Sequence, residues 1–141
     1  MSQADTSLNL TDGLAGALGM EFVETGPDRV VVRWTVGPHH RQPFGIVHGG
    51  VHCAVVETAA SVAAQYWLVS TGVEGYVVGV NNTTDFLRAV REGVLTAVAS
   101  PVHRGRLQQL WDVAITDESE RLVARGQVRL QNVTDTERLG R

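Results

Sequence analysis

One long apolar segment constrains this chain more than any other feature. After the glycine pair at positions 49 and 50, the sequence runs to Ser70 without a glycine or a proline and is rich in alanine. Such a composition predicts a single long helix over residues 50–70. Glu57 is the only carboxylate between Gln42 and Val73. Most of the other residues in this segment are apolar, so apolar side chains occupy most of the helix circumference. This distribution predicts that the helix is buried.

The rest of the chain is typical of short strands arranged around that helix. Residues 9–19 predict a short helix capped by Asn9 or Thr11, and residues 20–36 predict two strands joined by the turn TGPD. Four strand-like segments follow the long helix, separated by the turn signals REG, RGR and DESE. This order predicts an α+β fold in which one antiparallel sheet wraps the helix. We expect one domain over residues 1–131 and a polar tail over residues 132–141.

Composition excludes several classes of protein. The net charge of −3 indicates no broad nucleic-acid surface. The single cysteine, Cys53, excludes an intrachain disulfide and fits a reducing compartment. The N-terminus shows no secretory signal, and polar residues interrupt the longest apolar run, residues 51–69. We therefore expect a cytoplasmic protein that binds neither nucleic acid nor a membrane.

Glu57 is the first candidate for chemistry. Burying an unpaired carboxylate costs several kcal/mol, so an acid on an apolar helix indicates either a function or a partner such as Arg41 or Arg88. Ser61 lies four residues later and so on the same helix face. Its hydroxyl could bond a carboxylate, a water or a substrate, or simply the helix backbone one turn earlier.

The tripeptide HGG, His48 to Gly50, precedes the helix directly. The first N–H groups of a helix lack intrahelical partners, and two glycines allow a ligand to approach the backbone closely. Such a site can polarise a carbonyl oxygen, although Gly-Gly is also a common loop-to-helix junction. His48 and His52 are four residues apart, but a third ligand and the HExxH arrangement are missing. We therefore expect no metal and no other cofactor.

The densest cationic cluster is the stretch VHRGR, with His103, Arg104 and Arg106. Guanidinium groups bind phosphate through paired hydrogen bonds. An exposed hairpin turn is the alternative interpretation of the same residues.

Taken together, these segments resemble the hotdog-fold acyl-CoA thioesterases, in particular the phenylacetate-type and 4-hydroxybenzoyl-CoA-type branch. The resemblance lies in QPFGIVHGGVHCAVVETAAS, residues 42–61, which has the pattern Gln-Pro-x-Gly-x-x-His-Gly-Gly followed by Glu and, one turn on, Ser. The order of helix and strands is compatible over nearly the whole chain.

The resemblance implies a hydrolase that cleaves an acyl-CoA or aryl-CoA thioester. Glu57 would act as nucleophile or general base, and the Gly49 N–H would polarise the thioester carbonyl. Gln42 would orient the thioester or the water, and His48 would line the site. The roles of further residues would be as follows: Ser61 would hold the water or intermediate, and Gly50, His103, Arg104 and Arg106 would contact the substrate, the last three through the CoA phosphates.

The resemblance also implies that two subunits share each site and that homodimers assemble into homotetramers. Two other functions stay open at the level of the sequence. One is a non-catalytic acyl-CoA-binding module, against which the presence of both Glu57 and Gln42 argues mildly. The other is a hotdog hydratase or dehydratase using His48 and Glu57, against which the QPFG and HGG context speaks.

Overall fold

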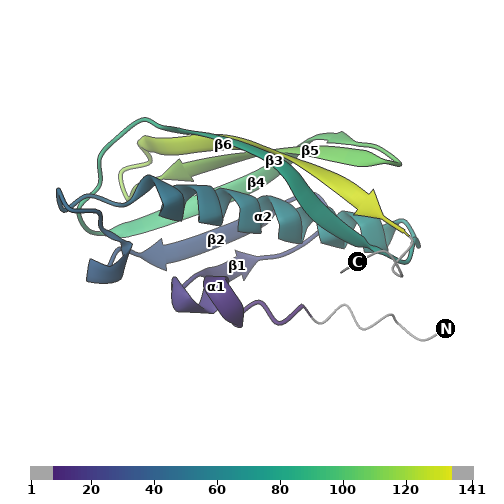
Figure 1. Cartoon of the computed structure of the whole chain (residues 1–141), viewed down its shortest axis with the longest axis horizontal. Helices are drawn as coiled ribbons and strands as arrows, with labels where there is room; N and C mark the ends of the chain where they lie inside the picture. The colour runs from purple at the N-terminus through teal and green to yellow at the C-terminus, as the bar shows by residue number, and fades with distance from the viewer. Residues whose placement is uncertain (1–7, 135–141) are drawn as a thin grey trace.

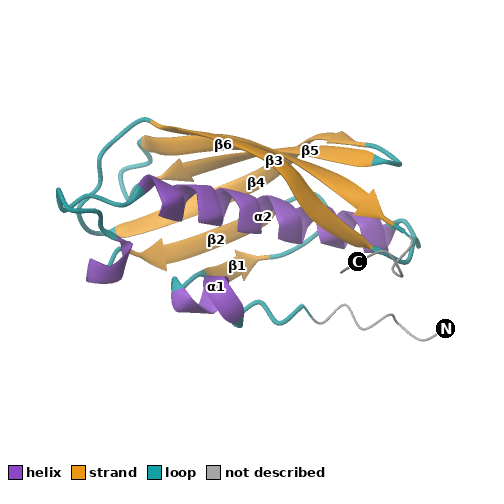
Figure 2. Ribbon diagram, in the orientation of Figure 1, coloured by secondary structure: helices purple, strands orange, loops and turns teal. Residues whose placement is uncertain are grey.

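The elements of the chain follow the expected order. The structure is a computed structural model that describes residues 8–134 (Figures 1 and 2). In chain order the elements are α1 (Gly13–Ala17), β1 (Glu21–Glu24), β2 (Val30–Thr35), the 3-10 turn η1 (Pro38–His40), α2 (Gly49–Ser70), β3 (Tyr76–Phe86), β4 (Val94–Arg104), β5 (Gln108–Thr116) and β6 (Leu122–Val133).

All six strands form one antiparallel sheet in the order β1-β2-β4-β5-β6-β3. Strand β3 pairs with β6 from Tyr76 opposite Val133 to Phe86 opposite Ala124, and it ends the sheet. The register shifts within β3, between Gly79 and Asn81. Such bulges bend a strand and increase its twist. The sheet accordingly curves along α2, which lies across one face (Figure 1).

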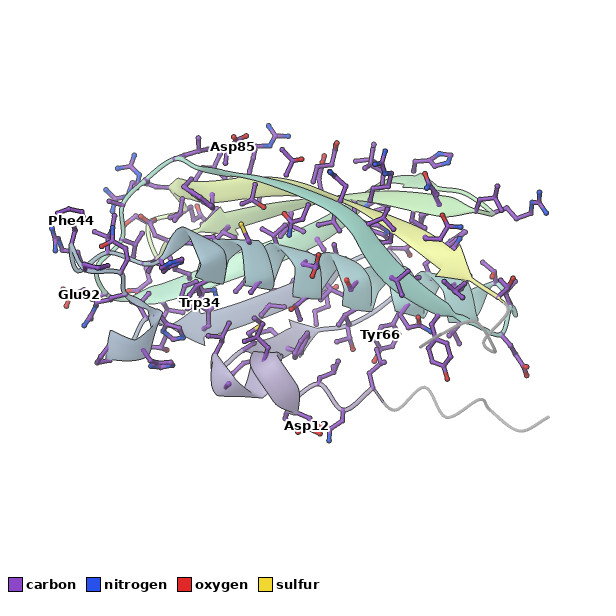
Figure 3. The ribbon with its side chains drawn as sticks, viewed as in Figure 1. Asp12, Trp34, Phe44, Tyr66, Asp85 and Glu92 are labelled. Atoms are coloured by element: carbon purple, nitrogen blue, oxygen red, sulfur yellow. The ribbon has the colours of Figure 1, made fainter. Side chains whose placement is uncertain are left out.

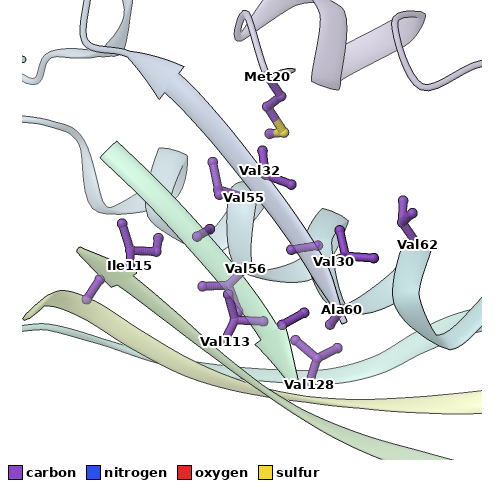
Figure 4. Close-up of a cluster of buried hydrophobic side chains, with 14 of the residues drawn as sticks. Met20, Val30, Val32, Val55, Val56, Ala60, Val62, Val113, Ile115 and Val128 are labelled. Carbon is purple, nitrogen blue, oxygen red and sulfur yellow. The ribbon is translucent and has the colours of Figure 1, made fainter. Parts of the chain in front are cut away.

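Alternation along the strands fixes which face of the sheet meets the helix. In β5, for example, every second residue from Gln109 to Ile115 is buried, the spacing that places side chains on one face. The apolar ones among them pack with buried side chains of β2, β4 and β6 against α2 (Figure 4). Small residues of the helix allow this close approach, because four alanines are fully buried: Ala59, Ala60, Ala63 and Ala64. The α+β hotdog arrangement expected from the sequence is confirmed.

The helix ends are set by local chemistry. His48 caps the start of α2, and Gly72, with φ of +81°, follows the C-cap Thr71. Within the described part of the chain, no helix is long and apolar enough to cross a membrane.

Two sequence-based boundaries differ from the structure. Helix α1 is capped by Asp12, whose carboxylate accepts a hydrogen bond from the Gly13 N–H at 3.0 Å. The expected cap, Asn9 or Thr11, is wrong because these two residues bond to each other just before the helix. Strand β6 includes Asn132 and Val133, so the sheet extends into the expected tail. Residues 135–141 of that tail lie outside the described residues.

Candidate active site

The start of α2 is shaped by the side chain of His48. This residue has an extended backbone, and its Nδ1 accepts a hydrogen bond from the Gly50 N–H at 2.8 Å. Gly49 is the first helical residue, so its N–H has no acceptor within the helix. The positive end of the helix dipole lies at the same point. The Gly49 N–H can therefore donate to the oxygen of a ligand.

The ring of Phe86 lies directly against Gly49. A Cβ added to Gly49 would be 2.5 Å from Cε2 and 2.7 Å from Cζ of this ring, so a side chain at position 49 would displace the ring. Phe86 ends β3 and remains 55% exposed, and its ring centroid is 6.0 Å from that of His52. An exposed aromatic side chain thus forms a wall beside the helix start.

Gln42 is oriented by the tight loop that precedes the helix. Its N–H donates to the Ile46 carbonyl at 2.8 Å, and its carbonyl accepts from the Gly45 N–H at 2.9 Å. Its Oε1 accepts from the Phe44 N–H. Arg91, in the loop between β3 and β4, holds this loop by donating to the Phe44 carbonyl at 3.1 Å. The side-chain NH₂ of Gln42 is the group of this residue that can contact a ligand.

Glu57 differs from the expectation in one respect, because its side chain is exposed within the single chain. None of the three ion pairs among the described residues includes it, and Arg41 instead donates to the Arg91 carbonyl. The carboxylate lies beside the edge strand: a Cβ added to Gly79 would be 3.0 Å from Glu57 Oε1. The expectation of a buried acid is wrong for one chain, since the sheet ends at β3.

Helix α2 and strand β3 run side by side in opposite directions (Figure 1). Near the end of the helix, Gln65 donates to the Gly75 carbonyl and accepts from the Val77 N–H, both at 3.0 Å. Nearer its start, the Asn82 amide donates to the Cys53 carbonyl at 3.0 Å. These bonds fix which residues of the helix face each part of the edge strand.

Glu57 and Gly49 are eight residues apart on this straight run of helix. At the helical rise of about 1.5 Å per residue, roughly 12 Å of axis separates them. Ser61, half-buried, lies one turn beyond Glu57. One carbonyl group cannot contact both the Gly49 N–H and the Glu57 carboxylate of the same chain. The two groups are therefore separate sites of contact within one chain.

The cationic cluster of the sequence divides into two parts in the structure. Arg104 pairs with Asp28 at 2.6 Å, and its guanidinium carbon lies 5.9 Å from the Trp67 ring centroid. These contacts brace the end of β4. His103 and Arg106 instead line a hollow of about 460 Å³ at the β4–β5 hairpin. The other lining residues are Gly105, Leu107, Gln108 and Gln131.

A hollow of about 470 Å³ lies at the other end of the sheet, between the segment 88–94 and the turn 117–121. Its charged lining comprises three arginines and three acids: Arg88, Arg91, Arg121, Glu92, Asp117 and Glu118. The Arg121 N–H donates to Asp117 at 2.9 Å, and this bond lowers the pKa of the carboxyl. Glu118 accepts from the Val94 N–H at 2.6 Å. The balanced charges and these turn contacts favour no ligand class. No group of three metal-ligating side chains occurs among residues 8–134.

Sequence reasoning weighed His40 and His52, near the helix start, only as metal ligands and did not predict that both are buried. His52 is only 3% exposed, and burial lowers the pKa of its imidazole to about 4. His40 is 1% exposed, and burial lowers its pKa as well. The pairs His39-His40 and His48-His52 are visible in the sequence, but their burial depends on packing against Trp34.

Comparison with known proteins decides the family. The family model described as "Thioesterase superfamily" matches residues 44–124, more than half of the chain. The chain belongs to the thioesterase superfamily. The matched stretch contains the helix start, Glu57, Ser61 and the hairpin with His103 and Arg106, whereas Gln42 lies just before it.

Relatives of this thioesterase are similar over most of their length. "Putative esterase Rv1847" of Mycobacterium tuberculosis is 53% identical over 126 residues, which cover 89% of this chain and 90% of that protein. The 1,4-dihydroxy-2-naphthoyl-CoA hydrolase of Listeria monocytogenes is 35% identical over 111 residues, covering 79% of this chain and 88% of that enzyme.

Solved structures confirm the fold of this thioesterase. The structure of the M. tuberculosis esterase Rv1847/MT1895 superimposes with a TM-score of 0.82, covering 84% of this chain and 94% of that chain. The crystal structure of AziG from S. sahachiroi is 51% identical and superimposes with a TM-score of 0.83, covering 87% and 98% of the two chains. The resemblance inferred from residues 42–61 is thus confirmed, and the protein is a hydrolase of thioesters.

Proposed function

We propose that this enzyme hydrolyses an acyl-CoA or aryl-CoA thioester, with Glu57 as the catalytic carboxylate and the Gly49 N–H as the donor to the thioester oxygen. One observation carries the proposal: the helix start and the carboxylate are both open to a ligand, yet about 12 Å of helix separates them. A complete site on this scheme needs Glu57 from one chain and Gly49 from another.

The edge strand β3 supports a second copy of this chain as the partner. This eleven-residue strand pairs with β6 on one side only. The first half of the strand exposes the side chains of Tyr76, Val78 and Val80. Unpaired edges with apolar side chains are templates for pairing with another strand. We infer that β3 pairs antiparallel with β3 of a second subunit, which joins the two sheets into one. Two such dimers would form the tetramer.

The arrangement of α2 along β3 agrees with a shared site. The middle of β3 lies near Asn82, whose side chain bonds the carbonyl of Cys53. Cys53 is midway between Gly49 and Glu57 in the helix. A two-fold axis at this level would therefore bring Glu57 of each chain opposite Gly49 of the other. Gln42 and His48, which flank that helix start, would enter the same site.

The chemistry on this scheme has two routes with the same products. In the first, a Glu57 oxygen attacks the thioester carbon and CoA leaves as its thiolate, which takes up a proton, and water then hydrolyses the resulting anhydride. In the second, Glu57 takes a proton from a water whose oxygen attacks the carbon directly, and the tetrahedral intermediate then expels CoA as its thiolate, which takes up a proton. In both, the Gly49 N–H stabilises negative charge on the carbonyl oxygen, a contribution worth about 10²–10³ in rate for one donor. Ser61 would hold the water or the intermediate beside Glu57.

The hollow at the β4–β5 hairpin supports a place for the CoA phosphates. His103 and Arg106 line it, and an arginine suits bidentate phosphate binding. Arg104, paired with Asp28, would support the hairpin rather than the phosphate.

Aromatic side chains at the helix start favour an aryl or medium-chain acyl group. Phe86 is 55% exposed beside Gly49, and Phe44 is 82% exposed at the same end of the molecule (Figure 3). Trp111 is fully buried, and its indole N–H donates to Gln109, so it belongs to the core. The naphthoyl substrate in the name of the 35% identical Listeria hydrolase supports the same class.

The test is thiol release from a panel of CoA thioesters: benzoyl, hydroxybenzoyl, phenylacetyl, hexanoyl and palmitoyl. We expect an aryl member to be hydrolysed fastest and Glu57→Gln to lose about 10²–10⁴-fold in kcat, the range for a catalytic acid or base. The amide keeps the shape of the side chain, so the melting temperature should stay near that of the wild type. Binding without hydrolysis, or a Glu57→Gln variant as fast as the wild type, would contradict the proposal.

A further inference from the structure

His40 is a buried junction between three parts of the chain. It ends η1, it is 1% exposed, and its ring lies edge-on to Trp34 with centroids 4.9 Å apart. Its Nδ1 accepts from the Gly37 N–H at 2.8 Å, and its Nε2 lies 2.8 Å from the carbonyl of Leu18, the C-cap of α1. Both ring nitrogens are therefore bonded to backbone groups on different segments.

These two bonds define one protonation state. Nδ1 accepts from an N–H and so carries no proton, which places the proton on Nε2, where it is donated to the Leu18 carbonyl. A neutral imidazole is the side chain that offers this acceptor and this donor from one rigid ring. Burial, which lowers the pKa of His40, favours the same neutral form.

The backbone of His40 reaches the candidate active site directly. Its carbonyl accepts from the N–H of His48 at 2.8 Å, and Arg41 pairs with Val47 in an isolated bridge. The intervening loop, which carries Gln42, is thus closed at its base by His40. His48 precedes Gly49, and its side chain accepts a hydrogen bond from the Gly50 N–H. The bond between the His48 N–H and the His40 carbonyl therefore also holds the residue that caps the helix.

We propose that His40 is a positioning residue for the hydrolytic site, because its neutral imidazole, bonded to Gly37 and Leu18, holds the carbonyl that anchors His48 and thereby aims the Gly49 N–H. The role of Gly49 rests on the proposed function, whereas the anchoring itself does not. A displacement of about 1 Å in such a group can cost about 10²-fold in rate. His40 itself contacts neither substrate nor reacting atoms in this scheme.

The experiment compares His40→Phe, which keeps a ring but loses both ring nitrogens, with His39→Gln. His39 is exposed and is the adjacent imidazole, so it is the matched control. In His40→Phe we expect kcat to fall about 10²-fold with KM changed by less than about threefold, because oxyanion contacts act in the transition state. In protein labelled with ¹⁵N-glycine and ¹⁵N-histidine, the amide signals of Gly49 and Gly50 should shift in His40→Phe and stay in place in His39→Gln.

Each result decides a separate point. If His40→Phe folds and keeps its kcat and its Gly49 and Gly50 signals, His40 does not position the site. If the wild type hydrolyses no thioester, the proposed function fails, and the shift or constancy of those two signals alone decides the role of His40.

If His40→Phe does not fold, acid titration of the labelled wild type decides instead. The charged or titratable groups around His40 are His39 and Arg41 in its own segment, His48, whose N–H bonds to the His40 carbonyl, and His52 of α2, which contacts the same Trp34 ring; α1 contributes a carbonyl. Because His48 Nδ1 accepts from the Gly50 N–H, protonation of His48 itself moves the Gly50 signal, and the Gly49 signal is the deciding one. The Gly49 signal should move in step with the ring nitrogens of His40 as Nδ1 gains a proton. Movement in step with His39, His48 or His52 alone would overturn the proposal.

Discussion

Gly79 leaves space for the Glu57 carboxylate beside β3. It lies at the register shift of β3, and a Cβ there would be 3.0 Å from Glu57 Oε1. We expect Gly79→Ala to displace the carboxylate slightly and to lower kcat about tenfold, and Gly79→Val to lower it about 10²-fold, since catalysis is sensitive to misplacement of about 1 Å. Steady-state kinetics on the preferred thioester measures this effect.

Gly26 offers a control for these substitutions. A Cβ at Gly26, in the turn between β1 and β2, would meet only the Arg29 carbonyl at 3.8 Å, an ordinary contact. Gly26→Ala should therefore leave kcat unchanged. If Gly79→Val hydrolyses the thioester as fast as Gly26→Ala does, the glycine at position 79 has no part in placing Glu57.

At the scale of elements, the proposed dimer depends on the edge strand β3. Val78 and Val80 are 36% and 49% exposed on this edge strand. Lysines there place like charges on both chains of the inferred β3–β3 pair, and charged edges are how proteins prevent such pairing. We expect Val78→Lys/Val80→Lys to be monomeric by light scattering and to lose at least about 10²-fold in kcat, because both Gly49 and Glu57 lose their partners.

The opposite edge of the sheet provides the control. Val23 of β1 is 51% exposed, and β1 is the other terminal strand. Val23→Lys should keep the assembly and the activity of the wild type. A double lysine variant of β3 that remains dimeric and active would exclude the shared site as drawn here.

At the scale of the whole molecule, buried histidines set the response to acid. Burial lowers the pKa of His52 to about 4, from 6.5 in the unfolded chain. Between these values the unfolded state binds more protons than the folded state, so stability falls as the pH drops from about 6.5 to 4, by at most about 1.4 kcal/mol per pH unit for this group. His40, whose pKa burial also lowers, acts in the same direction.

His52→Phe should flatten this dependence without removing it. Urea unfolding at several pH values between 4 and 7 would measure the slope for the wild type and the variant. We expect the variant to keep the part of the slope due to His40. An equal slope in the two proteins would show that His52 is not protonated on unfolding in this range.

The sequence alone was sufficient for the long helix, the succession of helices and strands along the chain, and the family motif. The alanine-rich run after Gly50, the alternation in β5 and the pattern in residues 42–61 are local signals, because helix and strand periodicities depend on neighbours along the chain. The same locality made His48, Gly49 and Glu57 visible as candidates.

Only the tertiary structure decided which of these groups lie together. The placement of β3 at the sheet edge leaves Glu57 exposed and beside Gly79, and η1 buries His40 between Gly37 and Leu18. Likewise Arg104 pairs with Asp28, whereas Arg106, two residues later in the sequence, lines the hollow at the β4–β5 hairpin. Exposure and hydrogen bonding depend on contacts between residues far apart in the chain, and a single sequence carries no direct record of such contacts.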